Sequence, residues 1–146
     1  MLIQSKHPMK PLIDPVPTDL IEAELTRERF LRPTNNGDNE IYVVTAGDSP
    51  NVMREIGRLR EVSFRDGGGG TGADMDIDEY DLDPEGYRQL IVWDPKQKEI
   101  VGGYRFIISH SSHPKCMSTE HYFRFTDKFR EEYLPYTIEL GRSFVQ

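Results

Sequence analysis

The chain has 146 residues, which is enough for one domain with a sizeable core but too few for two. Its composition, 36% hydrophobic and 29% charged, is that of an ordinary soluble protein, and the formal net charge of −7 argues against a nucleic-acid partner. No apolar run is long enough for a membrane span or a secretory signal. The single cysteine, Cys116, excludes an internal disulfide and indicates a reducing compartment, so we expect a cytoplasmic protein.

The sequence begins with an extended arm and a helix. Prolines recur through residues 1–17, keep the backbone extended and exclude a helix there, so we expect an arm on the surface. Thr18 and Asp19 then offer N-cap oxygens, and Glu22 stands three residues after Asp19, as in a capping box. This pattern predicts a helix that runs through about Leu31.

A strand, a second helix and a glycine-rich loop follow. β-branched and aromatic residues predict a strand over Ile41–Thr45. A helix is expected over roughly Asn51–Arg65, with an inner face formed by Val52, Ile56, Leu59 and Phe64. Residues 67–72 are almost all glycine, which indicates a flexible crossover, and they lack the Gly-Lys-Ser/Thr ending of a phosphate-binding P-loop.

Residues 74–83 are strongly acidic. Alternating aspartates and a glutamate, Glu85, at the twelfth position from Asp74 are features of a calcium-binding loop. Glu79, however, occupies the place where that loop requires glycine for its sharp turn. The sequence therefore favours a solvated acidic loop or a set of counter-ions for buried arginines.

The segment Gln89–Ser109 predicts the central hairpin of the fold. Two apolar runs flank the polar turn Asp94–Lys98, and each is too apolar for a lone ribbon, so we expect them in the middle of a sheet covered by helices. Arg105 lies in the most apolar part of the second run. A buried cation is costly unless a carboxylate meets it, so this residue requires an acidic partner elsewhere in the chain.

The last part of the chain predicts a loop, a helix and a closing strand. A loop with three histidines and Cys116 resembles a metal-ligand set, but it lacks the paired spacing of zinc sites, and no base is placed beside Cys116 for nucleophilic chemistry. The histidines are His110, His113 and His121. A helix is expected over Tyr122–Leu134, ended by Pro135, with Phe125, Phe129 and Tyr133 on its inner face. A strand is predicted over Tyr136–Val145.

Two charged residues, Glu139 and Arg142, interrupt this otherwise apolar strand. Residues three apart point to opposite faces of a regular strand, but a β-bulge at Gly141 would bring both to one side. We expect a network of two arginines and three carboxylates made by Arg105, Arg142, Asp78, Asp81 and Glu139. The residues alone leave open whether this network is a structural ion-pair lattice or an active site.

Four motifs stand in order along the chain: R-x-x-x-F at Arg60–Phe64, D-x-x-D at Asp78–Asp81, G-x-R at Gly103–Arg105 and E-x-x-R at Glu139–Arg142. They resemble the landmarks of a GNAT-like group of acyltransferases. That group includes the acyl-homoserine-lactone synthases and the bacterial N-acyltransferases of ornithine and glycine lipid synthesis, often called haemolysin-like. The resemblance covers roughly Ile41–Gln146 and is closer to the lipid-forming branch, particularly the glycine-lipid type of Bacteroidetes.

The resemblance implies an α/β (α+β), GNAT-like fold with a mixed, mainly antiparallel central sheet flanked by helices. Residues 1–39 would form the proline-rich arm and helix, and residues 40–146 the N-terminal part of the acyltransferase domain. GNAT enzymes continue from the last strand into a loop and helix that hold the donor, so we expect an incomplete sheet and no turnover by residues 1–146 alone. The lactone synthases carry a tryptophan where this chain has Gly67–Gly70, so their substrate pocket is not carried over.

The resemblance also implies a reaction. An acyl group would pass from acyl carrier protein or acyl-CoA to the amine of an amino acid, with no tightly bound cofactor and no metal. Glu139 would be the base, Arg142 and Arg105 would position that carboxylate and the acidic loop or clamp the acceptor's carboxylate, and backbone donors near the bulge would stabilise the oxyanion. The substrate-binding residues would be Asp78, Asp81, Arg60 and Phe64.

Two other functions stay open from the sequence. An acetyl-CoA-dependent N-acetyltransferase would share the fold and differ in donor chain length, and a non-catalytic binding module would use no thioester at all. A peripheral contact with the inner membrane and a homo-oligomer formed through the open edge of the last strand also stay open.

Overall fold

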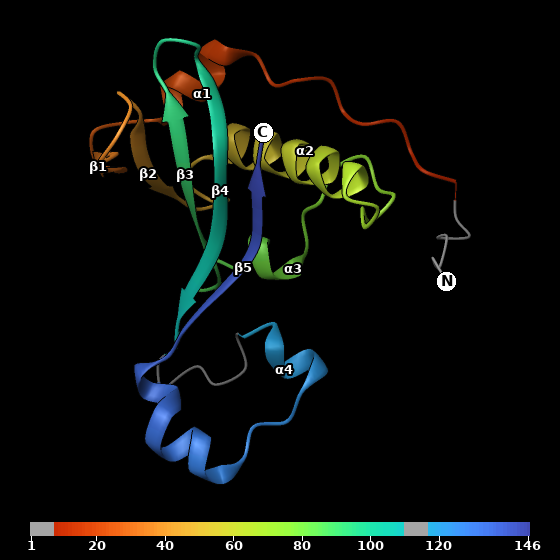
Figure 1. Ribbon diagram of the computed structural model, residues 1–146, viewed down its shortest axis with the longest axis vertical. Coiled ribbons are helices and arrows are strands. Elements are labelled where there is room, and N and C mark those ends of the chain that lie inside the picture. Colours follow the sequence, from red (N-terminus) through yellow and green to blue (C-terminus); the bar gives the residue numbers. More distant parts are fainter. Residues whose placement is uncertain (1–7, 110–116) are drawn as a thin grey trace.

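In the computed structural model, which describes residues 8–109 and 117–146, five strands lie side by side in chain order and each is antiparallel to its neighbour (Figure 1). The sheet is therefore antiparallel throughout the described residues, which confirms the predicted mainly antiparallel arrangement. The strands are β1 (Phe30–Pro33), β2 (Glu40–Val44), β3 (Arg88–Asp94), β4 (Glu99–Ile108) and β5 (Ile138–Val145).

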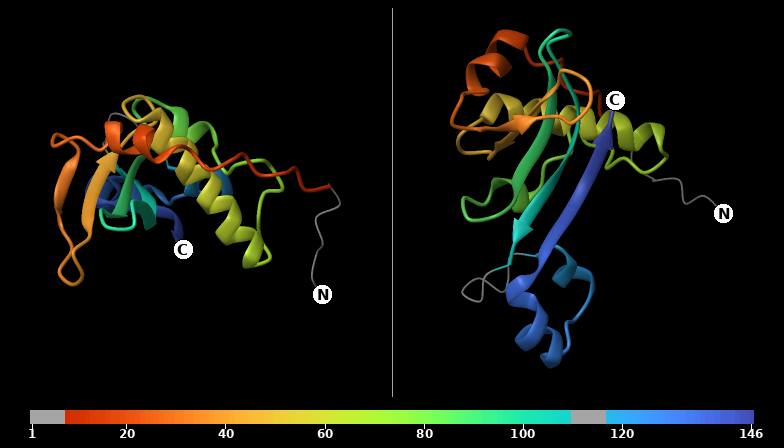
Figure 2. Two further views of the ribbon diagram at one scale, coloured as in Figure 1. Left: turned by 90° about the horizontal axis from the view of Figure 1, so that it is seen from above. Right: turned by 60° about the vertical axis from the view of Figure 1, so that its left-hand side comes forward.

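The predicted hairpin is confirmed as β3 and β4, at the centre of the sheet. The sequence predicted a sheet covered by helices, and the structure shows which face of the hairpin they cover. Burial alternates along β3, so that Ile91 and Trp93 are buried while Leu90 and Val92 are only half-buried. The helices α1 (Thr18–Glu24) and α2 (Pro50–Asp66) pack on the face that carries Ile91 and Trp93 (Figure 2).

Helix α2 (Pro50–Asp66) matches the predicted helix closely. Pro50 occupies the first turn, where its missing N–H costs nothing. Four apolar side chains face the sheet and join Trp93 in the main core, namely Val52, Met53, Ile56 and Leu59. Phe64 is partly buried against the same core. The apolar spacing of this segment therefore fixed both the helix and its buried face.

Helix α1 (Thr18–Glu24) is shorter than predicted and begins differently. Its N-cap is Pro17, without a side-chain cap hydrogen bond, so the predicted capping by Thr18 and Asp19 is wrong. The expected continuation to Leu31 is also wrong, because Phe30 starts β1 and packs edge-on against the ring of Tyr42 on β2, with centroids 5.6 Å apart. A longer helix is not formed because residues 30–33 pair with β2, whereas the apolar face of α1 buries only Ile21.

Between β4 and β5 the predicted helix Tyr122–Leu134 is interrupted at residues 123–126, and short helical turns stand on either side of the break. These are α4 (Thr119–Tyr122), a π-helical turn η1 (Phe129–Tyr133) and a 3-10 turn η2 (Leu134–Tyr136). They enclose a second core of Tyr87, Ile107, Met117 and Leu134, against which Phe125 and Phe129 pack. Tyr133 is 53% exposed, so its predicted inward position is wrong.

No helix among the described residues is both long enough and apolar enough to cross a membrane.

Candidate active site

The acidic segment, residues 74–83, folds into a structured turn. Asp78 caps the helical turn α3 (Glu79–Leu82): its carboxylate accepts the N–H groups of Tyr80 and Asp81, both at 3.1 Å. The side chain of Asp81 in return accepts the N–H of Asp78 at 3.2 Å. The spacing of these aspartates is that of a capping box, which explains why this loop is ordered.

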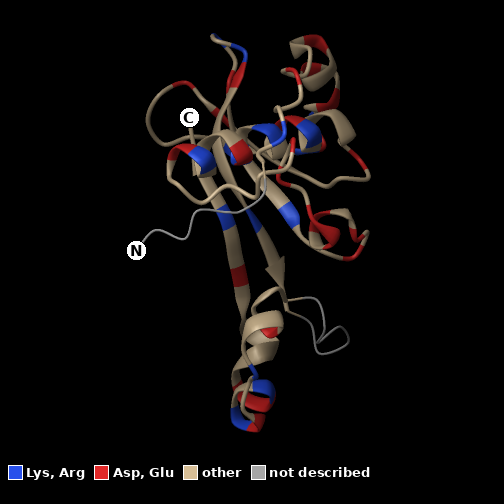
Figure 3. Cartoon of the chain, turned by 90° about the vertical axis from the view of Figure 1, so that its right-hand side faces the viewer, with Lys and Arg blue, Asp and Glu red and all other residues tan. Residues whose placement is uncertain are grey.

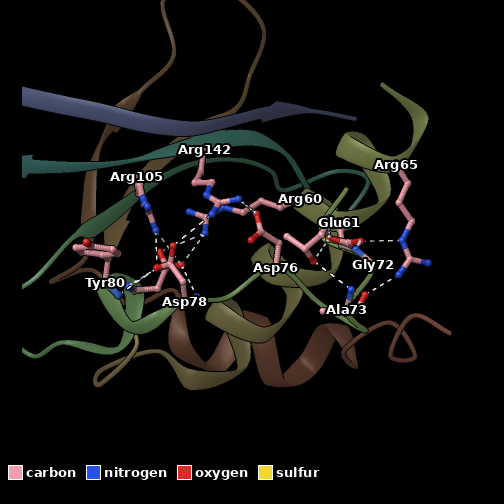
Figure 4. A network of polar contacts seen from close by, with 12 residues as sticks. Arg60, Glu61, Arg65, Gly72, Ala73, Asp76, Asp78, Tyr80, Arg105 and Arg142 are labelled. Atoms are coloured by element: carbon pink, nitrogen blue, oxygen red, sulfur yellow. Dashed lines mark hydrogen bonds and ion pairs between the residues drawn. The ribbon is translucent and has the colours of Figure 1, made fainter. Parts of the chain in front are cut away.

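Three arginines meet this acidic segment (Figure 4). Arg60 on α2 is fully buried and contacts both carboxylate oxygens of Asp81, at 3.1 and 3.2 Å. It also donates to the side-chain oxygen of Gln89 at 2.5 Å, and Gln89 donates to Asp81 at 2.8 Å. Burial lowers the pKa of Arg60, and the charge of Asp81 works against that effect. The three buried side chains form a closed polar unit beneath the cavity.

Arg105 on β4 and Arg142 on β5 complete the network. Arg105 pairs with Asp78 at 2.7 Å and with Asp81 at 3.2 Å. Arg142 pairs with Asp76 at 2.9 Å and with Asp78 at 3.3 Å. Figure 3 shows the basic positions of the central strands beside the acidic turn. The predicted counter-ions for buried arginines are therefore present, and Arg60 and Asp76 join the expected set.

The pKa of each of these aspartates depends on the balance between its burial and the cations beside it. Burial alone would raise the pKa of Asp78, but hydrogen bonding and charge from Arg105, with Arg142, hold it below its usual value. Asp76 is 3% exposed, and burial raises its pKa in spite of Arg142 and Arg60. Asp78 is thus the firmly ionised partner at the edge of the cavity.

The predicted β-bulge is present in β5. Arg105 pairs with Gly141 and Gly103 with Phe144, so β5 uses one residue more than β4 across this stretch. The left-handed residue of the bulge is Arg142, with φ of +53°, rather than glycine. Such a conformation costs about 1–2 kcal/mol for a residue with a side chain. The ion pairs of Arg142 hold it in place and direct its guanidinium into the cavity.

Glu139 lies apart from the arginine network, which differs from the predicted five-residue cluster. Its carboxylate accepts hydrogen bonds from the hydroxyl of Tyr87, from the hydroxyl of Ser118 at 2.5 Å and from the N–H of Thr119 at 3.3 Å. Partial burial would raise the pKa of Glu139, but these three donors outweigh it and hold the pKa below its usual value. Glu139 is therefore an ionised carboxylate without a described ion-pair partner.

A cavity of about 460 Å³ opens between the network and α4. Its lining combines the acidic turn, both strand arginines and the segment that contacts Glu139. The lining residues include Asp78, Tyr80, Arg105, Ser118, His121 and Arg142. Arg142 is 32% exposed at this surface, whereas Arg105 is 4% exposed. The Nε of Arg105 has no hydrogen-bond partner among the described residues.

The structure separates the sequence-predicted site residues into four groups. Arg105, Arg142 and Asp78 line the cavity, whereas Asp81 and Arg60 lie buried behind them. Glu139 reaches the cavity through Ser118. Phe64 belongs to the main core and does not line the cavity.

Sequence reasoning missed several residues of the site. Gln89 and Tyr87 precede or begin a strand and carry no motif, so their long-range partners give no local signal. Ser118 stands 21 positions before Glu139 and meets it only through the fold. Asp76 could have been found, because it continues the alternating aspartates that end at Asp78.

The glycine-rich loop after α2 is held by a buried carboxylate. Glu61 accepts hydrogen bonds from the N–H groups of Thr71 and Gly72, at 3.0 and 2.8 Å, and pairs with Arg65 at 2.8 Å. The sequence predicted a flexible crossover, whereas these contacts fix the course of the loop from α2 to the acidic turn (Figure 4).

Within residues 8–109 and 117–146, no group of three or more metal-binding side chains is arranged to hold an ion. The carboxylates of Asp76, Asp78 and Asp81 instead pair with arginines, and those of Asp78 and Asp81 also accept backbone N–H groups of the turn. The metal-ligand pattern considered at His110, His113 and Cys116 lies outside the described residues.

Comparison with known proteins places this site in a family. The model of the acetyltransferase (GNAT) domain matches residues 59–146, more than half of the chain. The chain belongs to this family. All four motifs lie within the matched GNAT region, which also carries the arginine network and the cavity.

Two curated relatives extend the match toward the N-terminus. A glycine N(alpha)-acyltransferase of Bacteroides thetaiotaomicron is 54% identical over 142 residues, which is 94% of this chain and 42% of the relative. One of the same name from Phocaeicola vulgatus is 53% identical, over 94% of this chain and 44% of the relative. The chain thus spans less than half the length of these relatives. No solved structure matches it.

Proposed function

We propose that the protein transfers an acyl group from an acyl thioester to the amine of glycine, as a step in glycine-lipid synthesis. The observation that carries the proposal is one cavity bordered by Arg105 and Arg142 on one side and by Ser118, the partner of Glu139, on the other. A zwitterionic amino acid needs this pairing of cationic and anionic groups. The names of the two relatives supply the acceptor, and the GNAT family supplies the thioester donor.

The acceptor carboxylate would bind at Arg142, with Arg105 behind it. A guanidinium has five donors, and only two of the donor nitrogens of Arg142 are used in the ion pairs with Asp76 and Asp78. The Nε of Arg105 has no partner among the described residues but is buried beside Gly141, so the exposed donors of Arg142 are the ones that suit a small carboxylate. Asp78, at the same wall, would order the ammonium group.

The acceptor must lose a proton before it attacks, because an ammonium group has no lone pair. In the proposal, Glu139 takes this proton, directly or through the hydroxyl of Ser118. The amine then attacks the thioester carbonyl, forming the C–N bond. Collapse of the tetrahedral intermediate breaks the C–S bond, and the departing thiolate takes the second amine proton. Backbone N–H groups of the Gly141–Ser143 bulge would stabilise the oxyanion.

Glu139→Gln tests this assignment in the full-length protein. The acceptor is glycine, and the donors are long-chain acyl carrier protein, long-chain acyl-CoA and acetyl-CoA. We expect N-acylglycine from a long-chain donor with the wild-type protein, and a fall in kcat of about 10²-fold or more for Glu139→Gln, because general-base catalysis contributes about that much. Product formation is measured by mass spectrometry.

The matched control is Glu22→Gln, an exposed carboxylate paired with Lys98 at the far end of the hairpin, which should leave kcat unchanged. Undiminished transfer by Glu139→Gln would remove Glu139 as the base. Product from acetyl-CoA alone would favour an N-acetyltransferase. Absence of product from glycine with all three donors would favour a binding module.

A further inference from the structure

Tyr87 is a buried tyrosine that the four motifs do not include. It lies just before β3, is 1% exposed and belongs to the second core with Ile107 and Met117. Its ring meets that of Tyr80 edge-on at 6.1 Å, and its N–H donates to the Tyr80 carbonyl at 3.3 Å. The ring is thus fixed between the acidic turn and the short turns that follow β4.

The hydroxyl of Tyr87 sits at the centre of the contacts of Glu139. It donates to Glu139 and accepts the N–H of Ser118 at 2.8 Å, while the Ser118 hydroxyl lies 3.2 Å away. Burial, and then the hydrogen bond to Glu139, raise the pKa of Tyr87 to about 12, so the hydroxyl stays protonated. The hydroxyl of Tyr87 therefore links Glu139 on β5 to Ser118, which lines the cavity.

The face of the Tyr87 ring meets a cation. The Arg105 guanidinium lies 4.6 Å from the ring centroid, within the range of a cation–π contact. Arg105 directs its Nη1 to Asp78 and Asp81, and no ion pair joins it to Glu139 in the described residues. The contacts described for the Arg105 guanidinium are therefore with tyrosine rings and with the acidic turn, not with Glu139.

Other charged or titratable groups stand on the elements around Glu139. They are Glu99, Tyr104 and Arg105 on β4, Arg142 on β5, and Glu120, His121 and Tyr122 on α4. None of them makes a described hydrogen bond or ion pair to Glu139, whose partners are Tyr87, Ser118 and Thr119. Tyr87 is therefore the only titratable group in direct contact with this carboxylate among the described residues.

We propose that Tyr87 is a positioning residue, whose hydroxyl holds the Glu139 carboxylate against Ser118 at the cavity wall. The hydrogen bonds stand whatever the reaction, whereas the catalytic role of the positioned carboxylate rests on the proposed function. An anionic Glu139 that makes no described ion pair with an arginine is available to an ammonium group.

The test is Tyr87→Phe, which keeps the ring and removes only the hydroxyl. Loss of one donor to the carboxylate should raise the pKa of Glu139, followed by NMR titration of protein labelled with ¹³C at glutamate side chains. In the acyl-transfer assay with glycine, kcat should fall about tenfold while KM for glycine stays within about twofold, because the acceptor carboxylate is bound elsewhere.

Tyr42→Phe is the matched control. Tyr42 is also a buried tyrosine whose hydroxyl donates to a carboxylate, that of Glu40 at 2.8 Å, and its pKa is also raised to about 12, but it lies in the main core. It should change neither the titration of Glu139 nor kcat. An unchanged Glu139 titration in Tyr87→Phe would overturn the inference.

A wild-type measurement protects the test against misfolding of the variant. The ¹³Cζ resonance of Tyr87 should move at acid pH as Glu139 takes up its proton, and a resonance that does not move would also overturn the inference. Both NMR readouts stand without acyl transfer. If the proposed function is wrong but the positioning role is right, no acyl-transfer product forms while both NMR titrations still behave as predicted.

Discussion

At the scale of single residues, Arg60 shows how the site is built into the core. Its side chain is 0% exposed and its partner Asp81 is 1% exposed, so neither ion has access to water. Asp81 also meets Arg105 and Gln89, which satisfy its remaining acceptor positions. A buried pair contributes little net stability compared with an apolar pair, but a single broken member leaves an uncompensated charge.

Arg60→Met should therefore lower the free energy of unfolding by about 3–5 kcal/mol, measured by urea denaturation. Adding Asp81→Asn in the same chain should recover part of this loss, because the unpaired charge is then gone. Lys96→Met removes an exposed pair with Asp38 and should have no measurable effect. A stable Arg60→Met protein would mean that Arg105 and Gln89 alone compensate Asp81.

At the scale of elements, the central hairpin depends on close backbone contact at two adjacent glycines. A Cβ at Gly103 would lie 2.4 Å from the carbonyl oxygen of Leu90, and one at Gly102 would lie 2.7 Å from that of Phe144. The obstacles are backbone atoms of the neighbouring strands, which cannot rotate away. Arg105 follows two residues after Gly103 on β4. The strand register that Gly103 allows therefore also sets Arg105 opposite Gln89 on β3 and Gly141 on β5.

Gly103→Ala should destabilise the protein by about 1–3 kcal/mol, as overpacking does in a well-packed interior. It should also weaken the Arg105 contacts, seen as a lower kcat in the acyl-transfer assay. Gly47→Ala is the matched control, since its Cβ would find only the Thr45 hydroxyl, at 4.0 Å. An unaffected Gly103→Ala protein would show that β3 and β4 can separate without loss.

At the scale of the whole molecule, ionised carboxylates tie distant parts of the chain together. Asp78 joins the acidic turn to β4 and β5, Glu61 joins α2 to the glycine-rich loop, and Glu139 joins β5 to Tyr87 and Ser118. Net interactions with arginines and hydrogen-bond donors lower the pKa of each, although burial opposes them. Asp76 shows the opposite shift because burial dominates there.

These shifts predict acid sensitivity. A carboxylate whose pKa is lower in the folded than in the unfolded state stabilises the fold above the unfolded value, about 4 for Asp and Glu, and that stabilisation is lost as the pH falls through the folded value. The free energy of unfolding in urea should therefore drop below about pH 4.5. Asp78→Asn keeps an N-cap side chain and should flatten this dependence, and an unchanged slope would contradict the assignment.

Local pattern was sufficient for much of the fold. The apolar stripe of α2, the two runs of the β3–β4 hairpin and the bulge beside Gly141 were all predicted from spacing, because each depends on neighbours a few residues apart. The end of α1 and the broken turns after β4 were not. There, pairing of Phe30 with β2 and burial of Phe125 and Phe129 in a second core override the helical propensity.

The site divides in the same way. The sequence by itself determined that arginines in apolar strands need carboxylates, and the acidic segment was the nearest supply, because an unpaired buried charge is too costly to keep. Only the tertiary structure decided which charges meet. Glu139 was expected in the arginine network, but Tyr87 and Ser118 hold it apart, and their contacts join residues 52 and 21 positions away in the chain. No local pattern encodes such pairings, since they arise when the sheet and the segment after β4 pack together.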